Sequence, residues 1–268
     1  MKYYLLNAFW ILIPIFLFAQ DIEYQNIPFF INGVKVQDPF AGGLNNPQFS
    51  SADLNLDGHD DILIFDRNGH VVVPFLFDPI SLRYNFDPAL AKVFPKVEDW
   101  VLARDFNKDG IVDLFCSSFR VGPAGIEVFQ GYESGGKIGF KPYLTYHPFN
   151  VLMWPTGNNR FTQIPVDYTD IPAVDDIDHD GDLDILCFEP GGSRVYYFRN
   201  ISIERGWGLD SLRFVLEDMC FGGFVESGFT SEIKLSNNKD SCASYLTGTD
   251  TKPRHAGSTL VSPDLDDD

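Results

Sequence analysis

The chain has 268 residues, of which 44% are hydrophobic and 22% are charged, so it can bury a core and does not have the composition of a disordered protein. Its 38 acidic residues outnumber the 20 basic residues and give a formal net charge of −18. Because nucleic acids are bound through an excess of Lys and Arg, this charge argues against a nucleic-acid partner. The frequent Phe, Gly and Pro residues favour many short strands over long helices.

Residues 1–19 have the pattern of a signal peptide. Lys2 provides a positive charge, residues 8–18 form an apolar stretch interrupted by Pro14, and Ala19 is a small residue at the expected cleavage point. This stretch is shorter than the roughly 20 residues that span a bilayer, and a buried strand or an uncleaved anchor is the alternative. We therefore predict a secreted or cell-surface protein whose mature chain starts at Gln20 and has no transmembrane segment.

An internal repeat organises the remaining chain. The pattern Asp-x-Asn/Asp-x-Asp-Gly-x-x-Asp occurs in full at residues 53–61, 105–113 and 176–184, and a fourth copy begins at 264–268, where the sequence stops. Thirteen of the 38 acidic residues are Asp at positions 1, 3, 5 and 9 of this pattern, so much of the negative charge belongs to these segments. Repeats are best identified before single elements, because their period determines the architecture.

Each full copy lies between short apolar runs that have the length of buried strands. The runs that precede the copies are 47–52, 100–103 and 171–174, and those that follow are 62–65, 114–116 and 185–188. Two more strand-like runs come after each copy, at 71–77 and 82–86, at 126–130 and 138–140, and at 194–198 and 212–216. About four strands per repeat predict an all-β fold of β-propeller blades. Segments 146–170 and 219–257 are predicted to be loop-rich insertions.

The repeated pattern has the chemistry of a calcium loop. Side chains at positions 1, 3, 5 and 9 and the backbone carbonyl at position 7 supply oxygen ligands, and the Gly at position 6 permits a sharp turn. Closely spaced carboxylates repel one another unless a cation lies between them. Magnesium is less favoured because it requires stricter octahedral geometry. The predicted ligands, with about one calcium ion per complete copy, are Asp53, Asn55, Asp57, His59, Asp61, Asp105, Asn107, Asp109, Ile111, Asp113, Asp176, Asp178, Asp180, Asp182, Asp184, Asp264, Asp266 and Asp268.

The pattern also resembles other acidic loops and turns. An EF-hand requires a Glu at position 12 and flanking helices, whereas position 12 here is Ile64, Cys116 or Cys187 and the flanks are strand-like. A dockerin-like loop fails for the same reason. Asp/Asn/Gly turns that bind nothing remain the alternative, and the recurrence of the pattern in one strand context argues against them.

The four cysteines fall into two classes. Cys116 and Cys187 lie within apolar runs at equivalent repeat positions, so we expect them to be buried and unpaired. Cys220 and Cys242 flank a segment rich in Gly and Asn and are the better disulfide candidates, with two unrelated thiols as the alternative. No Cys or His spacing predicts a zinc site.

The sequence resembles FG-GAP/VCBS repeat proteins and is similar to the N-terminal β-propeller of integrin α subunits. The resemblance is carried by residues 53–61, 105–113, 176–184 and the run Val-Tyr-Tyr-Phe-Arg-Asn at 195–200, and it covers roughly residues 40–268. It implies a ring that commonly has seven blades, one calcium ion per motif-bearing blade and, in many bacterial members, export and a C-terminal sorting module. Because the sequence stops within the fourth copy, we expect residues 20–268 to be an incomplete domain of three to four blades from a longer reading frame.

Two functional classes follow from this interpretation. The first is a non-catalytic binding or adhesion module for a protein or glycan partner, in which the insertions carry recognition. Within them, Trp154, Phe161, Phe221 and Phe224 are either exposed anchors or, more ordinarily, core residues. The alternative is an accessory propeller of a larger secreted enzyme whose catalytic part lies downstream.

Catalysis within these residues is not predicted. The 5 histidines show no metalloprotease spacing, and the sequence has no nucleophile elbow or phosphate-binding loop. His59 and His179 lie within the repeated pattern, where we expect them to face solvent.

Overall fold

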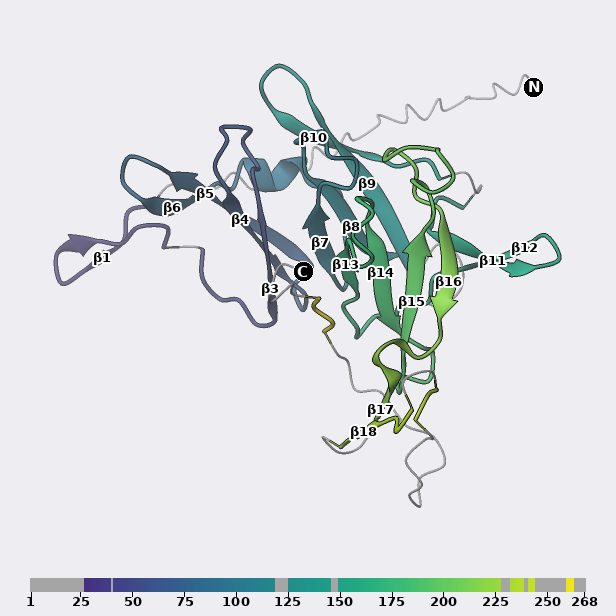
Figure 1. Cartoon of the computed structure of the whole chain (residues 1–268). Coiled ribbons are helices and arrows are strands. Elements are labelled where there is room, and N and C mark those ends of the chain that lie inside the picture. The colour runs from purple at the N-terminus through teal and green to yellow at the C-terminus, as the bar shows by residue number, and fades with distance from the viewer. Residues whose placement is uncertain are drawn as a thin grey trace, which may run out of the picture. The chain divides into compact units, whose positions relative to one another are not determined.

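The computed structural model describes residues 27–39, 41–118, 125–145, 149–227, 232–238, 241–243 and 259–262 (Figure 1). The predicted signal peptide at 1–19 lies outside these residues. The described residues contain strands and two short 3₁₀ turns but no α-helix, so the predicted all-β class is confirmed. The chain divides into a unit of residues 1–37 and a unit of residues 38–268. The first contains a hairpin of β1 (Phe30–Ile31) and β2 (Val34–Lys35).

The second unit contains three four-stranded sheets, which we call blades 1, 2 and 3. In each, the strands lie side by side in chain order and every neighbouring pair is antiparallel. Successive four-stranded meanders are the architecture of propeller blades, and they form no closed barrel within the described part of the chain. The strands are β3 (Pro47–Ala52), β4 (Asp61–Asp66), β5 (Val71–Asp78) and β6 (Arg83–Phe86) in blade 1; β7 (Val101–Arg104), β8 (Asp113–Ser118), β9 (Gly125–Glu133) and β10 (Ile138–Pro142) in blade 2; and β13 (Ala173–Asp175), β14 (Asp184–Phe188), β15 (Val195–Asn200) and β16 (Phe214–Asp218) in blade 3.

The register of the strands repeats from blade to blade. In every blade, the last residue of the first strand pairs with the Asp that begins the second strand, and the next residue of the second strand pairs with a Phe of the third. The first set of pairs is Ala52 with Asp61, Arg104 with Asp113 and Asp175 with Asp184. The second set is Ile62 with Phe75, Leu114 with Phe129 and Ile185 with Phe198. The internal repeat of the sequence is therefore also a repeat of strand pairing.

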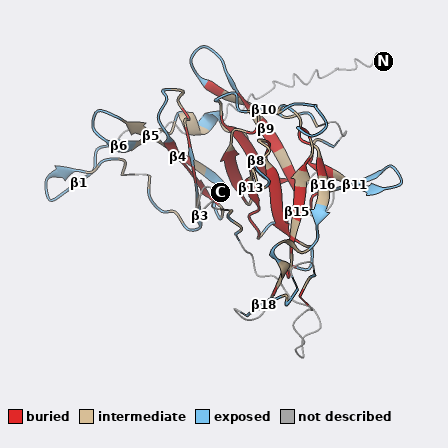
Figure 2. Cartoon of the chain, in the orientation of Figure 1, coloured by how far each residue is buried: buried red, intermediate tan, exposed pale blue. Residues whose placement is uncertain are grey.

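The core consists of layers between adjacent blades, because the central strands bury both of their faces. In β8, Leu114 and Cys116 pack in the cluster shared with blade 1, whereas Phe115 packs in the cluster shared with blade 3. Figure 2 shows this burial along β8, β9 and β15, in contrast to the exposed β1. Cys116 and Cys187 are buried and take no part in the disulfide, as predicted. Alternation of side chains across a strand explains why such runs are apolar throughout.

The first strands of adjacent blades are also joined by polar contacts. Val101 N–H donates to the Gln48 side-chain oxygen at 3.2 Å, which links β7 to β3. Arg104 Nε donates to the Val174 carbonyl at 2.9 Å, which links β7 to β13. These bonds bring together the strands that lead into the acidic loops.

Both predicted insertions contain hairpins, which corrects the expectation of loops. Segment 149–170 forms β11 (Met153–Gly157) and β12 (Arg160–Gln163), and the intervening Asn158 and Asn159 are left-handed, as a tight hairpin turn requires. This Asn-Asn pair was a turn signal that sequence reasoning missed. Segment 219–238 contains a 3₁₀ turn (Phe221–Gly223), β17 (Phe224–Glu226) and β18 (Ile233–Leu235).

The candidate anchors and the candidate disulfide can now be placed. Trp154 packs against the core between blades 2 and 3, and Phe221 and Phe224 pack against the outer face of blade 3. Phe161 alone among these four aromatic residues is exposed. Cys220 and Cys242 form the predicted disulfide, with their Cα atoms 5.7 Å apart.

Candidate metal centres

Three acidic loops connect the first and second strands of the three blades, and we call them loop 1 (residues 53–61), loop 2 (105–113) and loop 3 (176–184). They share an unusual backbone. The residue at position 4 is left-handed in each, with φ of 62° at Leu56, 56° at Lys108 and 60° at His179. The Gly at position 6 also has a positive φ in all three loops. Residues with a Cβ rarely adopt this conformation, so its recurrence shows that the loops have the same fold.

Loop 2 shows how this turn directs its side chains inward. The Asp105 carboxylate accepts the backbone N–H of Asp109 at 3.2 Å and that of Gly110 at 2.8 Å. Asp109 in turn accepts the N–H of Ile111 at 2.8 Å. Loop 1 repeats all three contacts at its equivalent positions. Positions 1 and 5 are thus held on the concave side of the turn by bonds to its own backbone.

The Asp at position 9 is buried and joins three segments of its blade. In blade 2, Asp113 Oδ2 accepts the N–H of Phe106 at 3.0 Å, and Oδ1 accepts the N–H of Gly131 at 2.8 Å. The first of these donors is position 2 of the loop and the second is in the third strand. Asp61 and Asp184 make the same pair of bonds in blades 1 and 3. Sequence reasoning assigned these residues only as metal ligands and missed this backbone role.

Loop 3 brings three carboxylates together. One oxygen from each of Asp176, Asp178 and Asp180 lies within 4.8 Å of the others. Asp176 Oδ1 and Asp180 Oδ2 are buried and have no hydrogen-bond partner among the described residues. A buried carboxylate oxygen without a donor is costly unless a cation contacts it. This all-oxygen donor set fits a hard metal ion, and loop 3 therefore could hold one.

Burial and mutual repulsion raise the pKa of several loop carboxyls. Burial, followed by repulsion from Asp109 and Asp105, raises the pKa of Asp113 to about 7 against the bonds from Gly131 and Phe106 that lower it. Burial likewise raises the pKa of Asp184 to about 6. Burial also raises the pKa of Asp182 to about 7, so three loop carboxyls are close to protonation at neutral pH. A bound cation would favour their charged forms.

The remaining predicted ligands fall into three groups. His59 and His179 have exposed side chains, as expected, so any role of His59 as a ligand is through its backbone carbonyl. Asn55 and Asn107 each lie beside position 5 and donate to its carboxylate, at 2.9 and 3.0 Å. The predicted ligands Asp264, Asp266 and Asp268 lie outside the described residues.

The segment that precedes this fourth copy has a defined place beside blade 3. Thr259 forms a parallel bridge with Ile171, and Leu260 N–H donates to the Ile171 carbonyl at 3.0 Å. Ser262 Oγ donates to Asp175 Oδ2 at 3.0 Å. Residues 259–262 thus run alongside the strand that leads into loop 3, where the first strand of a next blade belongs.

Three residues near the loops, Asp210, Lys108 and Glu204, escaped sequence reasoning because they meet the loops across large sequence separations or at an unassigned position, and Asp182 was predicted as a ligand only through its backbone carbonyl. Asp210 accepts a bond from Asn107 Nδ2 at 3.1 Å, which ties loop 2 to the β15–β16 connection of blade 3. Lys108 reaches loop 3, where its Nζ lies 3.4 Å from the place of a Cβ on Gly181. The side chains of Asp182 and Glu204 meet Asp180, with their carboxylate oxygens within 4.8 Å of one another. An acidic residue at position 7 was the one available sequence signal.

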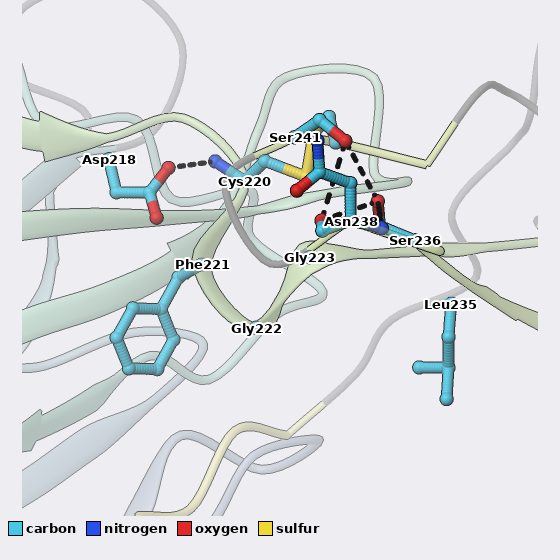
Figure 3. Close-up of a pocket in the computed structure, with 10 residues that line it drawn as sticks. Asp218, Cys220, Phe221, Gly222, Gly223, Leu235, Ser236, Asn238 and Ser241 are labelled. Atoms are coloured by element: carbon cyan, nitrogen blue, oxygen red, sulfur yellow. Dashed lines mark hydrogen bonds between the residues drawn. A yellow bond between two sulfur atoms is a disulfide. The ribbon is translucent and has the colours of Figure 1, made fainter.

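A cavity of about 690 Å³ lies beside the disulfide, in the second insertion (Figure 3). Phe221 and Leu235 are at opposite ends of the group of residues drawn there. Between them, the hydroxyls of Ser236 and Ser241 lie 3.0 Å apart and share a hydrogen bond. This cavity is remote in sequence from the acidic loops, and its polar groups are satisfied locally.

Across the described ranges, no helix is long and apolar enough to cross a bilayer. Neither a protein-family model nor a curated protein matches the chain.

Proposed function

We propose that the protein is a secreted or cell-surface repeat protein of the FG-GAP/VCBS type, in which calcium ions bound by the acidic loops stabilise propeller blades. The single observation that carries the proposal is the recurrence of one loop geometry at the same place in three blades. All three loops have a left-handed residue at position 4 and a left-handed Gly at position 6. In loops 1 and 2 the carboxylates at positions 1 and 5 bond to the backbone of the turn, and in loop 3 the carboxylates at positions 1, 3 and 5 come together.

The donor set favours calcium among the divalent cations. Each loop offers only oxygen donors, from carboxylates, from a side-chain amide in loops 1 and 2, and from a backbone carbonyl. Calcium accepts six to eight oxygens in flexible geometry, whereas magnesium requires near-octahedral geometry and keeps its waters. No thiol or imidazole belongs to the inward donor set, which disfavours zinc.

The role of the ion is proposed to be structural, with recognition left to other surfaces. The position-9 carboxylate contacts both the loop and the third strand, so an ion bound to it would hold three segments of a blade together. A rigid scaffold of this kind suits a non-catalytic module that binds a protein or glycan through variable loops. Phe161, on the exposed hairpin β11–β12, supports this proposal as a contact residue.

The proposal is tested by calcium titration of the chelator-treated protein, using calorimetry and thermal melts. We expect binding in the range of other extracellular modules, on the order of 10⁻⁴ to 10⁻³ M, and a rise in melting temperature. Asp57→Ala should remove one site, because Asp57 is at position 5 of loop 1. The matched control is Asp60→Ala, which removes an exposed carboxylate of the same loop that faces Ser51 Oγ at 3.0 Å. A folded protein without calcium binding, or equal effects of the two substitutions, would refute the proposal.

A further inference from the structure

Loop 3 differs from the other two loops at position 7. Asp182 stands there, whereas loops 1 and 2 have His59 and Ile111. The Asp182 side chain turns into the protein, and only 1% of the residue is exposed. Its Oδ2 accepts the N–H of Ile203 at 3.1 Å, but its Oδ1 finds no hydrogen-bond donor in the described structure. A buried carboxylate oxygen of this kind requires a positively charged or donating neighbour.

The fold places another carboxylate, that of Glu204, beside Asp182. The turn after β15 crosses loop 3, and the bond from Ile203 N–H to Asp182 fixes the position of the next residue, Glu204. One carboxylate oxygen from each of Asp180, Asp182 and Glu204 lies within 4.8 Å of the other two. This group shares Asp180 with the group formed by the inward side chains of loop 3, so the two groups are adjacent.

The local charge around loop 3 can accommodate more than one divalent cation. Loop 3 carries five carboxylates and Glu204 adds a sixth. The cationic side chains found beside them are Arg199, which pairs with Glu204, and Lys108 from loop 2. With all six carboxyls ionised, the excess would be four negative charges, which is twice what one divalent ion neutralises. Loop 1 has four carboxylates, of which that of Asp60 is exposed and accepts a bond from Ser51 Oγ, and loop 2 has three.

We propose that blade 3 binds a second divalent cation, held by Asp180, Asp182 and Glu204 and bridged through the Asp180 carboxylate to the ion of loop 3. This inference rests on the proposed cation site of loop 3 and adds a ligand, Glu204, from outside the repeated pattern. Sharing a carboxylate between two ions is the arrangement of two-metal centres, in which the ions lie about 4 Å apart. Oxygen donors again select a hard cation such as Ca²⁺ or Mn²⁺.

The test compares Glu204→Gln with Glu217→Gln in the full chain. Both residues pair with Arg199, Glu217 at 3.3 Å, but only Glu204 belongs to the carboxylate group. In equilibrium dialysis with radioactive Ca²⁺, we expect Glu204→Gln to bind one ion fewer per chain than wild type, and Glu217→Gln to bind the wild-type number. Asp182→Asn, which keeps an acceptor for Ile203 and the backbone carbonyl, should lose the same ion and provides a second variant if Glu204→Gln unfolds.

Electron paramagnetic resonance of the Mn²⁺-loaded protein adds a readout that a merely structural role would not change. Two carboxylate-bridged Mn²⁺ ions should give a spin-coupled spectrum in wild type and Glu217→Gln, and only uncoupled Mn²⁺ in Glu204→Gln. Equal stoichiometry in all variants with only uncoupled Mn²⁺ would overturn the second ion and leave the calcium loops intact. Absence of Ca²⁺ and Mn²⁺ from the folded wild-type protein would overturn both proposals.

Discussion

Replacing Asp113 with Ala separates the two roles of the position-9 carboxylate, as a ligand and as a backbone acceptor. The substitution leaves the N–H groups of Phe106 and Gly131 without their acceptor, at bonds of 3.0 and 2.8 Å in a buried place. Each unsatisfied buried donor costs about 1–3 kcal/mol, so we expect a loss of about 2–6 kcal/mol in the free energy of unfolding. This loss should occur without any calcium present.

The assay is urea denaturation followed by Trp fluorescence, in chelator at pH 6. At this pH the Asp113 carboxyl, whose pKa is raised to about 7, is mostly neutral, so relief of a buried charge does not mask the lost bonds. The control is Asp109→Ala, which removes a carboxylate of the same loop whose bonds lie in exposed surroundings. Its cost in chelator should be about 0.5 kcal/mol. Costs for the two variants within 0.5 kcal/mol of each other would refute the proposed backbone role.

Three further predictions concern pH, packing and the disulfide. Because protons compete with the cation for Asp113, calcium affinity should fall as the pH is lowered from 8 to 6. In chelator the melting temperature should instead fall as the pH rises through about 7, because the folded state prefers the neutral Asp113 carboxyl. Calcium titrations and thermal melts across this pH range check both signs. Gly131→Ala should lower stability by about 1–3 kcal/mol in denaturant melts with or without calcium, because a Cβ there would lie 2.2 Å from the Val112 carbonyl oxygen. Replacing both Cys220 and Cys242 with Ser should cost about 3 kcal/mol in the same assay, as expected for a bridge spanning 22 residues, and an unchanged midpoint would show that the bridged segment is not part of the cooperative unit.

The blades could be predicted from the sequence because their signals are local. The run Pro47–Ala52 has the same bounds as β3, and the apolar runs after each acidic loop lie within the second strands. A repeated loop between repeated apolar runs predicts both the order of the strands and the positions of the candidate ligands. The hairpin β11–β12 was not predicted, because its strands are mostly exposed and show no clear alternation of apolar and polar residues. The hydrophobic pattern therefore gave no strand signal there.

From the sequence, only the part of each candidate site that lies within one loop could be predicted. Sequence spacing identified inward positions 1, 3 and 5, but it could not show that Asp113 would accept a bond from Gly131, 18 residues later. Nor could it bring Glu204 to Asp182, because that meeting depends on where the turn after β15 crosses loop 3. The pattern assigns position 7 a backbone carbonyl ligand, which every residue type provides, and so gives no weight to an acidic side chain there.

The bonds of the position-9 carboxylate also bear on how the chain tolerates insertions. Each of these Asp residues bonds to a donor 7 residues before it and to another 16 or 18 residues after it, so all three partners belong to the same blade. A one-residue slip of the second strand against the third would break the second bond, and every blade therefore fixes its own register. Segments between blades carry none of this constraint. They can lengthen, as the hairpin β11–β12 shows, while the blades on either side keep their pairing.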